Sequence, residues 1–270
     1  MSRLKKFFSR KKSKKEQEKV QEQEIENEEE NASSSDYEIN ESERVFGIPL
    51  GEIAAREGMK EGSVPRVLKE CIKYLEDLGK FEEGIYRLNG SITQRAKLKN
   101  KYDSQREVDF EKISDENTVA SLIKLFFREL PESVFTNKNT RELAQISKYH
   151  EKKQTSMLIE VIKKLPKVNI SVLAIFFPHL LRVSAKSSVN KMDIKNLSIV
   201  FSPTLKLPPK IFSTMLNSWD EIFKSLELDQ EEEEEEEKEK EKEETKEEEE
   251  EKEEEKEKKE EEEEKEKEIN

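Results

Sequence analysis

The sequence predicts an all-α fold, with a single helical domain between two charged, disordered tails. Apolar side chains recur at helical spacing through the middle of the chain, and no run alternates apolar and polar residues as a β-strand would. The charges divide the chain in the same way. Residues 41–230 hold 31 basic and 26 acidic residues and nearly all the apolar ones, whereas residues 231–270 hold 10 basic and 27 acidic residues. We therefore predict a basic and then Glu-rich segment at 1–43, a helical domain at 44–228 and a Glu/Lys-rich tail at 229–270.

The first half of the predicted domain holds three helices, at 64–78, 91–102 and 119–130. Pro65 suits the first turn of the first helix, and Gly79 is expected to end it. Ser91 and Gln94 form a capping-box pattern that begins the second. Pro131 is expected to stop the third.

Apolar residues in the second half predict further helices at 143–149, 157–165, 170–183, 194–201 and 211–226. Proline makes two of these unusual. Pro178 lies inside the most apolar segment, and we expect it to kink or divide that helix. Pro203 is expected to end the helix that begins at Ile194.

Residue types that carry most chemistry are scarce. Cys71 is the one cysteine, so no disulfide or multi-cysteine zinc site can form, and its place on an apolar helix face predicts a core thiol. His150 and His179 lack the spacing of metal ligands, and we interpret both as structural or solvent-facing. No glycine pattern fits a phosphate-binding loop. We therefore expect no metal, no cofactor and no acid–base or covalent chemistry carried out by this chain itself.

The two ends of the chain differ in sign. The first fifteen residues contain eight basic and no acidic residues, and Leu4, Phe7 and Phe8 would share one face of a helix. Such a segment could bind an anionic membrane surface, act as a nuclear-import signal, attract RNA or remain a flexible tail. The Glu/Lys tail has no apolar face, so it is either a solitary charged helix or a disordered acidic brush. We find no secretory signal and no uninterrupted apolar run of about 18 residues, and expect a cytoplasmic protein, peripheral to a membrane if residues 1–15 bind one.

One loop stands out, between the first and second predicted helices. Gly84 and Gly90 bracket it, and it carries a single arginine, Arg87, between apolar neighbours. Glycines permit unusual backbone angles, and the apolar neighbours would anchor the loop and leave the guanidinium to project. Taken alone, an arginine in a loop is usually an ordinary surface charge.

This loop resembles the arginine-finger segment, Gly-x-x-Arg-x-x-Gly, of the Rho-type GTPase-activating (RhoGAP) domain family. Other segments are similar to that family in the same order along the chain: Phe46–Leu50, Val64–Ile72, Val119–Glu132 and Asn190–Thr204. The match is nearest to the Ral-binding-protein branch, whose coiled-coil Ral-binding region has no visible counterpart here. The family often has a proline where Ser133 stands, so the loop after Pro131 is expected to differ.

The resemblance implies a helical fold that stimulates GTP hydrolysis by a Rho/Rac-family small GTPase. Arg87 would be the arginine finger, inserted into the partner's active site. Lys124 and Arg128, four residues apart and so on one helix face, would support the finger loop and contact the GTPase. Asn196 would brace the finger. Asn190 is a weaker candidate, as a loop or capping residue, and Pro203 would shape the groove for the partner.

The resemblance also implies which protein holds the nucleotide and the metal ion. GTP and Mg²⁺ are held by the partner GTPase in its GTP-bound form, so the chain needs no cofactor of its own. A non-catalytic GTPase-binding or scaffold module with the same fold is the alternative. No nucleic-acid partner is expected, because the chain is net acidic and lacks interleaved aromatics beyond Phe7 and Phe8.

Overall fold

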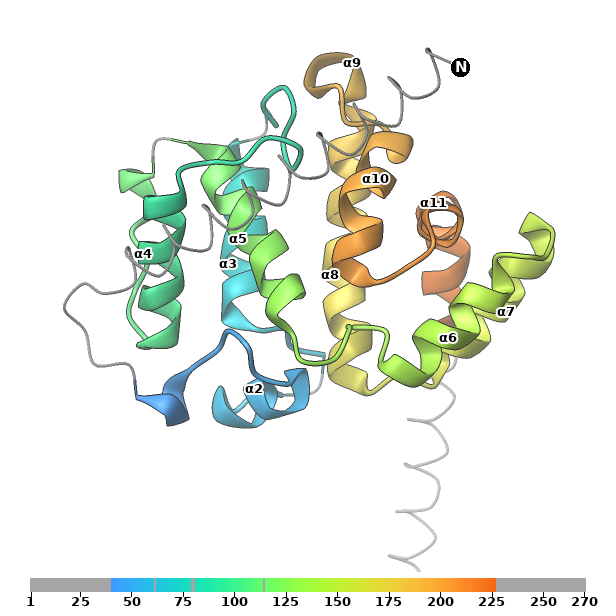
Figure 1. Cartoon of the computed structure of the whole chain (residues 1–270), viewed down its shortest axis with the longest axis horizontal. Helices are drawn as coiled ribbons and strands as arrows, with labels where there is room; N and C mark the ends of the chain where they lie inside the picture. The colour runs from blue at the N-terminus through green and yellow to red at the C-terminus, as the bar shows by residue number, and fades with distance from the viewer. Residues whose placement is uncertain (1–39, 61, 79–80, 114, 227–270) are drawn as a thin grey trace, which may run out of the picture. The chain divides into compact units, whose positions relative to one another are not determined.

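Helices make up all the regular secondary structure in the computed structural model, which describes residues 40–60, 62–78, 81–113 and 115–226 (Figure 1). The predicted all-α fold is therefore confirmed. Residues 1–39 and 227–270, which hold most of the two predicted tails, lie outside the described residues. The elements are η1 (Glu41–Glu43), α2 (Leu50–Arg56), α3 (Arg66–Leu78), α4 (Ile92–Asp103), η2 (Phe110–Lys112), α5 (Glu116–Glu129), α6 (Asn137–Ile146), α7 (Glu151–Lys163), α8 (Lys167–Ala185), α9 (Ser187–Asn190), α10 (Ile194–Leu205) and α11 (Pro209–Asn217).

The central helix is α5, which packs against α3, α4 and α10 (Figure 1). Eleven of its fourteen residues are buried, so it has almost no free face. Phe126 meets the ring of Phe46 edge-on at 5.7 Å between centroids, and Phe127 lies 4.6 Å from Phe176 of α8. This aromatic core fixes the axis of α5, and with it the two cations at its exposed end.

Pro178 does not divide the most apolar helix, because α8 runs unbroken from Lys167 to Ala185 (Figure 1). The proline removes one backbone donor, and the buried side chains on both sides of it hold the helix together. α8 is also long and apolar enough to cross a membrane by length and composition, although we found no such uninterrupted run in the sequence. Its apolar side chains are instead buried in the domain, as expected of a core helix: Val172, Leu173, Phe176, Phe177, Leu180 and Val183.

The prediction that Pro203 ends a helix is wrong. α10 continues through Pro203 to Leu205 and ends at Lys206, which is left-handed at φ 58°. The missing N–H of Pro203 would have bonded the carbonyl of Ile199, a residue that is 63% exposed. That carbonyl therefore keeps access to water, and proline costs the last turn little. The final predicted helix is also interrupted: α11 ends at Asn217, and helical backbone resumes at residues 219–226.

The loop after Pro131 depends on Ser133, where the family often has proline. The buried Ser133 hydroxyl donates to the carbonyl of Leu205 at 2.8 Å and accepts from the backbone N–H of Phe135 at 3.3 Å. The first bond ties the loop to the end of α10. Proline has no hydroxyl and could not make it.

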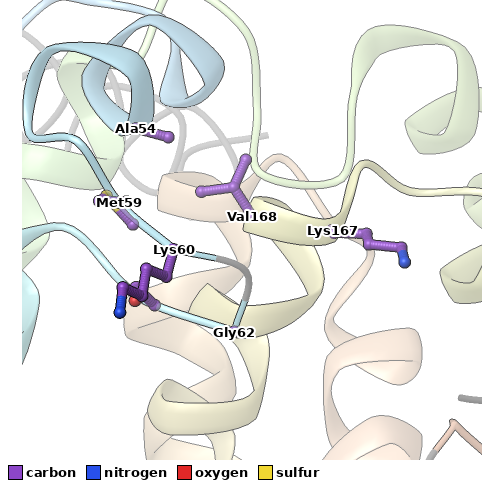
Figure 2. Close-up of a pocket in the computed structure, with 7 residues that line it drawn as sticks. Ala54, Met59, Lys60, Gly62, Lys167 and Val168 are labelled. Atoms are coloured by element: carbon purple, nitrogen blue, oxygen red, sulfur yellow. The ribbon is translucent and has the colours of Figure 1, made fainter. Parts of the chain in front are cut away.

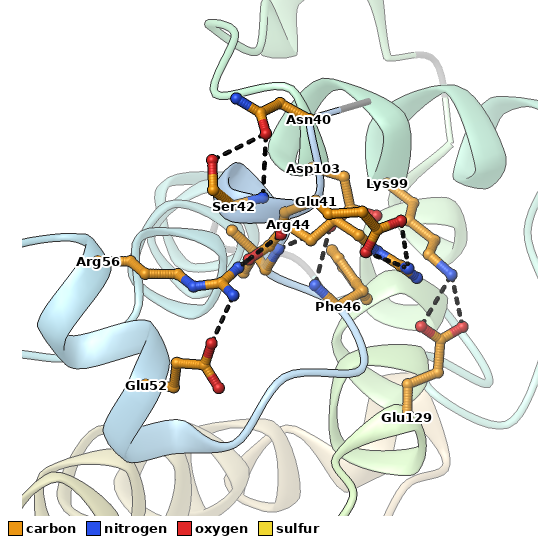
Figure 3. Close-up of polar contacts among 11 residues, drawn as sticks. Asn40, Glu41, Ser42, Arg44, Phe46, Glu52, Arg56, Lys99, Asp103 and Glu129 are labelled. Atoms are coloured by element: carbon orange, nitrogen blue, oxygen red, sulfur yellow. Dashed lines mark hydrogen bonds and ion pairs between the residues drawn. The ribbon is translucent and has the colours of Figure 1, made fainter. Parts of the chain in front are cut away.

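The segment before α2 is held by the end of α4 (Figure 3). Asp103 Oδ1 accepts hydrogen bonds from the backbone N–H groups of Val45, at 2.8 Å, and Phe46, at 2.9 Å. Burial raises the pKa of Asp103, and these two bonds oppose that shift. One turn earlier on α4, Lys99 pairs with Glu129 of α5 at 2.8 Å. Thus α4 links the start of the domain to its central helix.

Candidate functional site

The arginine loop, defined here as residues 82–90, joins α3 to α4 and is tied down at both ends. At its start, Gly84 has φ 81°, and its N–H donates to the carbonyl of Asn190 at 2.8 Å. At its end, Gly90 lies so close to α5 that a Cβ there would be 2.1 Å from the backbone nitrogen of Thr118. Ser91 N–H then donates to Thr118 Oγ1 at 2.9 Å. Only glycine fits at position 90, because the neighbouring atoms are backbone.

The predicted capping box at the start of α4 is half formed. Ser91 Oγ accepts from the N–H of Gln94 at 3.3 Å, as predicted. The N–H of Ser91 is already bonded to Thr118, so it is not available to the side chain of Gln94, whose Oε1 is buried with no hydrogen-bond partner among the described residues. The N–H of Ser91 therefore holds the loop to α5 and takes no part in the local cap of α4.

Tyr86 anchors the middle of the arginine loop. It is fully buried and has φ 66°, in the left-handed region that L side chains rarely adopt. Its ring meets Phe201 of α10 edge-on at 5.0 Å between centroids, and its hydroxyl lies 2.5 Å from Nε2 of His179. Its carbonyl accepts a hydrogen bond from Lys124 Nζ at 2.5 Å. Side chain and backbone of one residue are therefore both fixed.

Arg87, the next residue, is exposed. Its backbone N–H bonds the carbonyl of Gly84 at 2.8 Å, and its Nη2 lies over Gly84, where a Cβ would come within 2.9 Å of it. Within the described residues its guanidinium makes no hydrogen bond or ion pair. The backbone of the loop is thus held firmly, while the charged side chain of Arg87 keeps its hydrogen-bond donors unused.

Lys124 and Arg128 lie one turn apart on α5, as predicted, and differ in what they contact. Lys124 Nζ bonds the carbonyl of Tyr86 and lies 3.5 Å from Oδ1 of Asn89, so it supports the arginine loop directly. Burial, and then the charges of Arg128 and Arg95, lower the pKa of Lys124 from 10.5 to about 8. Arg128 is exposed and has no polar partner among the described residues.

The two asparagines have different places, and Asn190 is the closer to the loop. It is fully buried, and besides its carbonyl bond to Gly84 its side chain donates to Val183 and accepts from Met192, each at 2.8 Å. Asn196 Nδ2 donates to the carbonyl of Lys191 at 2.8 Å, and this bond fixes the turn after Asn190. Among the described residues, Asn196 has no hydrogen bond to the arginine loop.

Pro203 is exposed near the end of α10, and among the described residues it has no hydrogen bond to the arginine loop. The sequence predictions for Cys71 and His150 need no revision. Cys71 is fully buried, and burial raises its pKa to about 12. His150 is exposed before α7.

Sequence reasoning missed the residues beneath Tyr86. His179 of α8 is fully buried, and its Nδ1 lies 3.0 Å from Oε1 of Glu76 on α3. Arg182 Nε donates to the same carboxylate oxygen at 2.8 Å. Residue 179 is 93 positions from residue 86 and 103 from residue 76, so no local pattern could have paired them.

A small cavity lies elsewhere, between the segment that follows α2 and the start of α8 (Figure 2). Ala54, Met59 and Val168 form much of its wall, and no residue of the arginine loop lines it. Within the described residues no group of three or more His, Cys, Asp or Glu side chains could hold a metal ion.

Residues 65–210 match the RhoGAP domain family, a region that covers more than half of the chain. The chain belongs to the RhoGAP domain family. The probable Rho-type GTPase-activating protein 2 of Schizosaccharomyces pombe is 34% identical over 190 residues, which are 67% of this chain and 15% of that protein. Rho GTPase-activating protein 35 of Canis lupus familiaris is 37% identical over 172 residues, 63% of this chain and 11% of that protein.

The solved structure of human Rho GTPase activating protein 15 has a similar RhoGAP domain. It aligns with 67% of this chain and 93% of its own, with a TM-score of 0.63 and 28% sequence identity. The curated relatives are much longer, and this chain spans only 11–15% of the two named above. The matched region, 65–210, contains the arginine loop, both cations of α5 and both asparagines.

Proposed function

We propose that this RhoGAP domain stimulates GTP hydrolysis by a Rho/Rac-family small GTPase, with Arg87 inserted in trans as the arginine finger. The observation that carries the proposal is the contrast within the arginine loop. Tyr86 is fully buried and bonded on two sides, whereas the guanidinium of Arg87 is exposed with no partner among the described residues.

The chemistry that this arrangement suits is charge stabilisation. In GTP hydrolysis by a small GTPase, negative charge builds up on the phosphate oxygens, and an arginine supplied by an activator is worth roughly 10³–10⁵ in rate. Arginine stays protonated and its planar fork can donate to two oxygens. A loop that is already fixed loses little conformational entropy when the finger enters, so less binding energy is spent on ordering it.

Exposed apolar residues lie in the arginine loop and next to Asn190, and they suit a protein partner. Leu88 is 43% exposed beside Arg87, and Val189 is 65% exposed beside Asn190, the residue bonded to Gly84. Burying such side chains at an interface would exclude water around the finger, and electrostatic interactions are stronger in a water-excluded site.

The test is GTP hydrolysis by a panel of GTP-loaded Rho-family GTPases with and without the protein. We expect stimulation of at least one member, and a loss of roughly 10³-fold or more with Arg87→Ala. Arg141→Ala is the matched control, because Arg141 is another exposed arginine without a described polar partner, on α6. Full stimulation by Arg87→Ala would refute the finger assignment. Tight binding of the GTP-bound form without stimulation would identify the alternative, a non-catalytic GTPase-binding module.

We also propose that the protein is cytoplasmic and that residues 1–15, outside the described residues, bind an anionic membrane surface. The eight positive charges and three apolar side chains of that segment support this. We expect the protein to sediment with vesicles that contain about a third phosphatidylserine, and deletion of 1–15 to abolish sedimentation. Equal sedimentation with and without the segment would exclude it as the membrane contact.

A further inference from the structure

A chain of polar side chains runs through the core from α3 to the arginine loop. Oε1 of Glu76 lies 3.0 Å from Nδ1 of His179, and Nε2 of His179 lies 2.5 Å from the hydroxyl of Tyr86. His179 and Tyr86 are fully buried, and the Glu76 side chain is 29% exposed. The three residues come from three separate elements, α3, α8 and the loop that carries Arg87.

The chemistry of the groups fixes the direction of both hydrogen bonds. The hydrogen bonds from His179 and Arg182 lower the pKa of Glu76, so its carboxylate is ionised and can only accept. Nδ1 of His179 must then donate to it. Burial lowers the pKa of His179 below 6.5, so at neutral pH the ring is uncharged and Nε2 accepts. The Tyr86 hydroxyl is left with one role, to donate to Nε2.

The end of this chain is the point at which the loop backbone is strained. Tyr86 holds φ 66°, a left-handed conformation that is unfavourable for an L residue, so the surroundings must impose it. Two hydrogen bonds reach this residue: His179 holds the side chain and Lys124 holds the carbonyl. The direction in which the chain leaves Tyr86 sets where Arg87 begins.

We propose that Glu76 and His179 are positioning residues for the arginine finger, acting through the hydroxyl of Tyr86. Neither offers a group to a partner's phosphates: His179 is fully buried, and Glu76 is a carboxylate that is already bonded to Arg182 and His179. They fix the tautomer and the ring orientation that hold Tyr86 in its strained conformation. This inference rests on the proposed function, because it assigns these residues a part in placing Arg87.

The first test is Tyr86→Phe, which removes only the hydroxyl and leaves the ring in the core. With the donor gone, residue 86 loses one of its two polar restraints, and Arg87 starts from a wider range of positions. We expect the maximal stimulated rate of GTP hydrolysis to fall about three- to tenfold, while KM for the GTP-bound GTPase changes less than about twofold. The exposed residues that would dock the partner are unaltered.

Tyr102→Phe is the matched control. Tyr102 is also fully buried, and its hydroxyl also bonds a glutamate of α3, Glu70, at 2.9 Å, but it lies on α4 and not in the arginine loop. Both variants lose one buried tyrosine hydroxyl, so we expect similar changes in Tm. We expect only Tyr86→Phe to lower the maximal rate.

A second pair of variants tests Glu76 itself. The amide oxygen of Glu76→Gln can still accept from Nδ1 of His179, whereas Glu76→Ala leaves that N–H without a partner. We expect Glu76→Ala to lower the maximal rate as Tyr86→Phe does, and Glu76→Gln to restore most of it. If Glu76 had a merely structural role, the two substitutions would change the Tm of the protein. The maximal rate, measured well below each Tm, would stay constant.

The outcomes separate this inference from the proposed function. If the unaltered protein stimulates a GTPase and Arg87→Ala does not, the assignment of Arg87 as the finger is supported, whatever the results for the Tyr86 and Glu76 variants. In that case, a Tyr86→Phe rate equal to wild type, or a Tyr102→Phe loss as large as that of Tyr86→Phe, would overturn the positioning role alone. If the unaltered protein stimulates no GTPase of the panel, the proposed function fails and this inference fails with it.

Discussion

Arg87 and Tyr86 are neighbours with opposite surroundings, and their contrast explains how a short loop can present a charge firmly. The left-handed turn at Tyr86 sends one side chain into the core and leaves the next in solvent. The folding energy of the core therefore fixes Tyr86, while Arg87 keeps its hydrogen-bond donors for a partner. If Arg87 is the arginine finger that we propose, it is organised before it binds.

Lys124 gives the site a predicted dependence on pH. Its folded-state pKa, about 8, lies below the ordinary 10.5, so the folded protein releases this proton at lower pH than the unfolded chain does. The resulting destabilisation of the folded state is present in full below about pH 8 and disappears as pH rises to 10.5. Over the same range Tyr86 loses a charge-assisted hydrogen bond, because the amine becomes neutral.

We therefore expect kcat/KM for stimulated hydrolysis to fall as pH rises through about 8, after division by the intrinsic GTPase rate at each pH. Lys124→Arg keeps its charge at all these pH values, so its profile should be flat whatever its absolute rate. An unchanged alkaline fall in Lys124→Arg would show that another group titrates.

At the scale of elements, the arginine loop depends on its close approach to α5, and Gly90 is the residue that permits it. A Cβ at this position meets backbone atoms of Thr118 that cannot move without shifting the helix. We expect Gly90→Ala to lose about 1–3 kcal/mol of unfolding free energy in urea titrations and to lower the stimulated rate, because the loop is displaced.

Gly51→Ala is the control for that substitution. Gly51 lies in α2, where a Cβ would have no atom within 4 Å, so alanine should gain about 0.4–1 kcal/mol through lower entropy of the unfolded chain. Equal changes in unfolding free energy for the two substitutions would mean that Gly90 does not lie close to the backbone of α5.

The helices themselves were largely predictable, because each depends on local signals. Apolar spacing located α3, α5, α8 and α10, and Ser91 marked the start of α4. Two errors concern proline. Pro178 is tolerated in α8, whose buried apolar side chains lie on both sides of it in the sequence, and Pro203 is tolerated because it lies in the last turn of α10, four residues after the exposed Ile199.

At the scale of the whole molecule, the part of the site that could be predicted is the part that lies in local sequence motifs. Arg87, Lys124, Arg128, Asn190 and Asn196 follow from motifs in the sequence. The hydrogen bonds among Glu76, His179 and Tyr86 do not follow from any sequence motif. These residues are joined only by the packing of α3 against α8 and of the loop over both. His179 looked like an ordinary core histidine in an apolar helix, and its partners are 93 and 103 residues away.

The net charge of −13 likewise describes no single part of the protein. The domain region is mildly basic, which would suit the proposed contact of Arg87 with a partner's phosphates, whereas residues 231–270 carry 27 acidic residues. Charges of one sign near the site would speed encounter with a phosphate-bearing partner, and salt would weaken that effect.

The most direct test of the central claim measures binding to the transition state. A GTPase loaded with GDP and aluminium fluoride mimics the transferring phosphoryl group, and the finger should contribute mainly to that complex. We expect aluminium fluoride to tighten the binding of the wild-type RhoGAP domain to the GDP-loaded GTPase by about 100-fold or more, and the binding of Arg87→Ala hardly at all. Equal tightening of both proteins would contradict the assignment of Arg87 as the arginine finger.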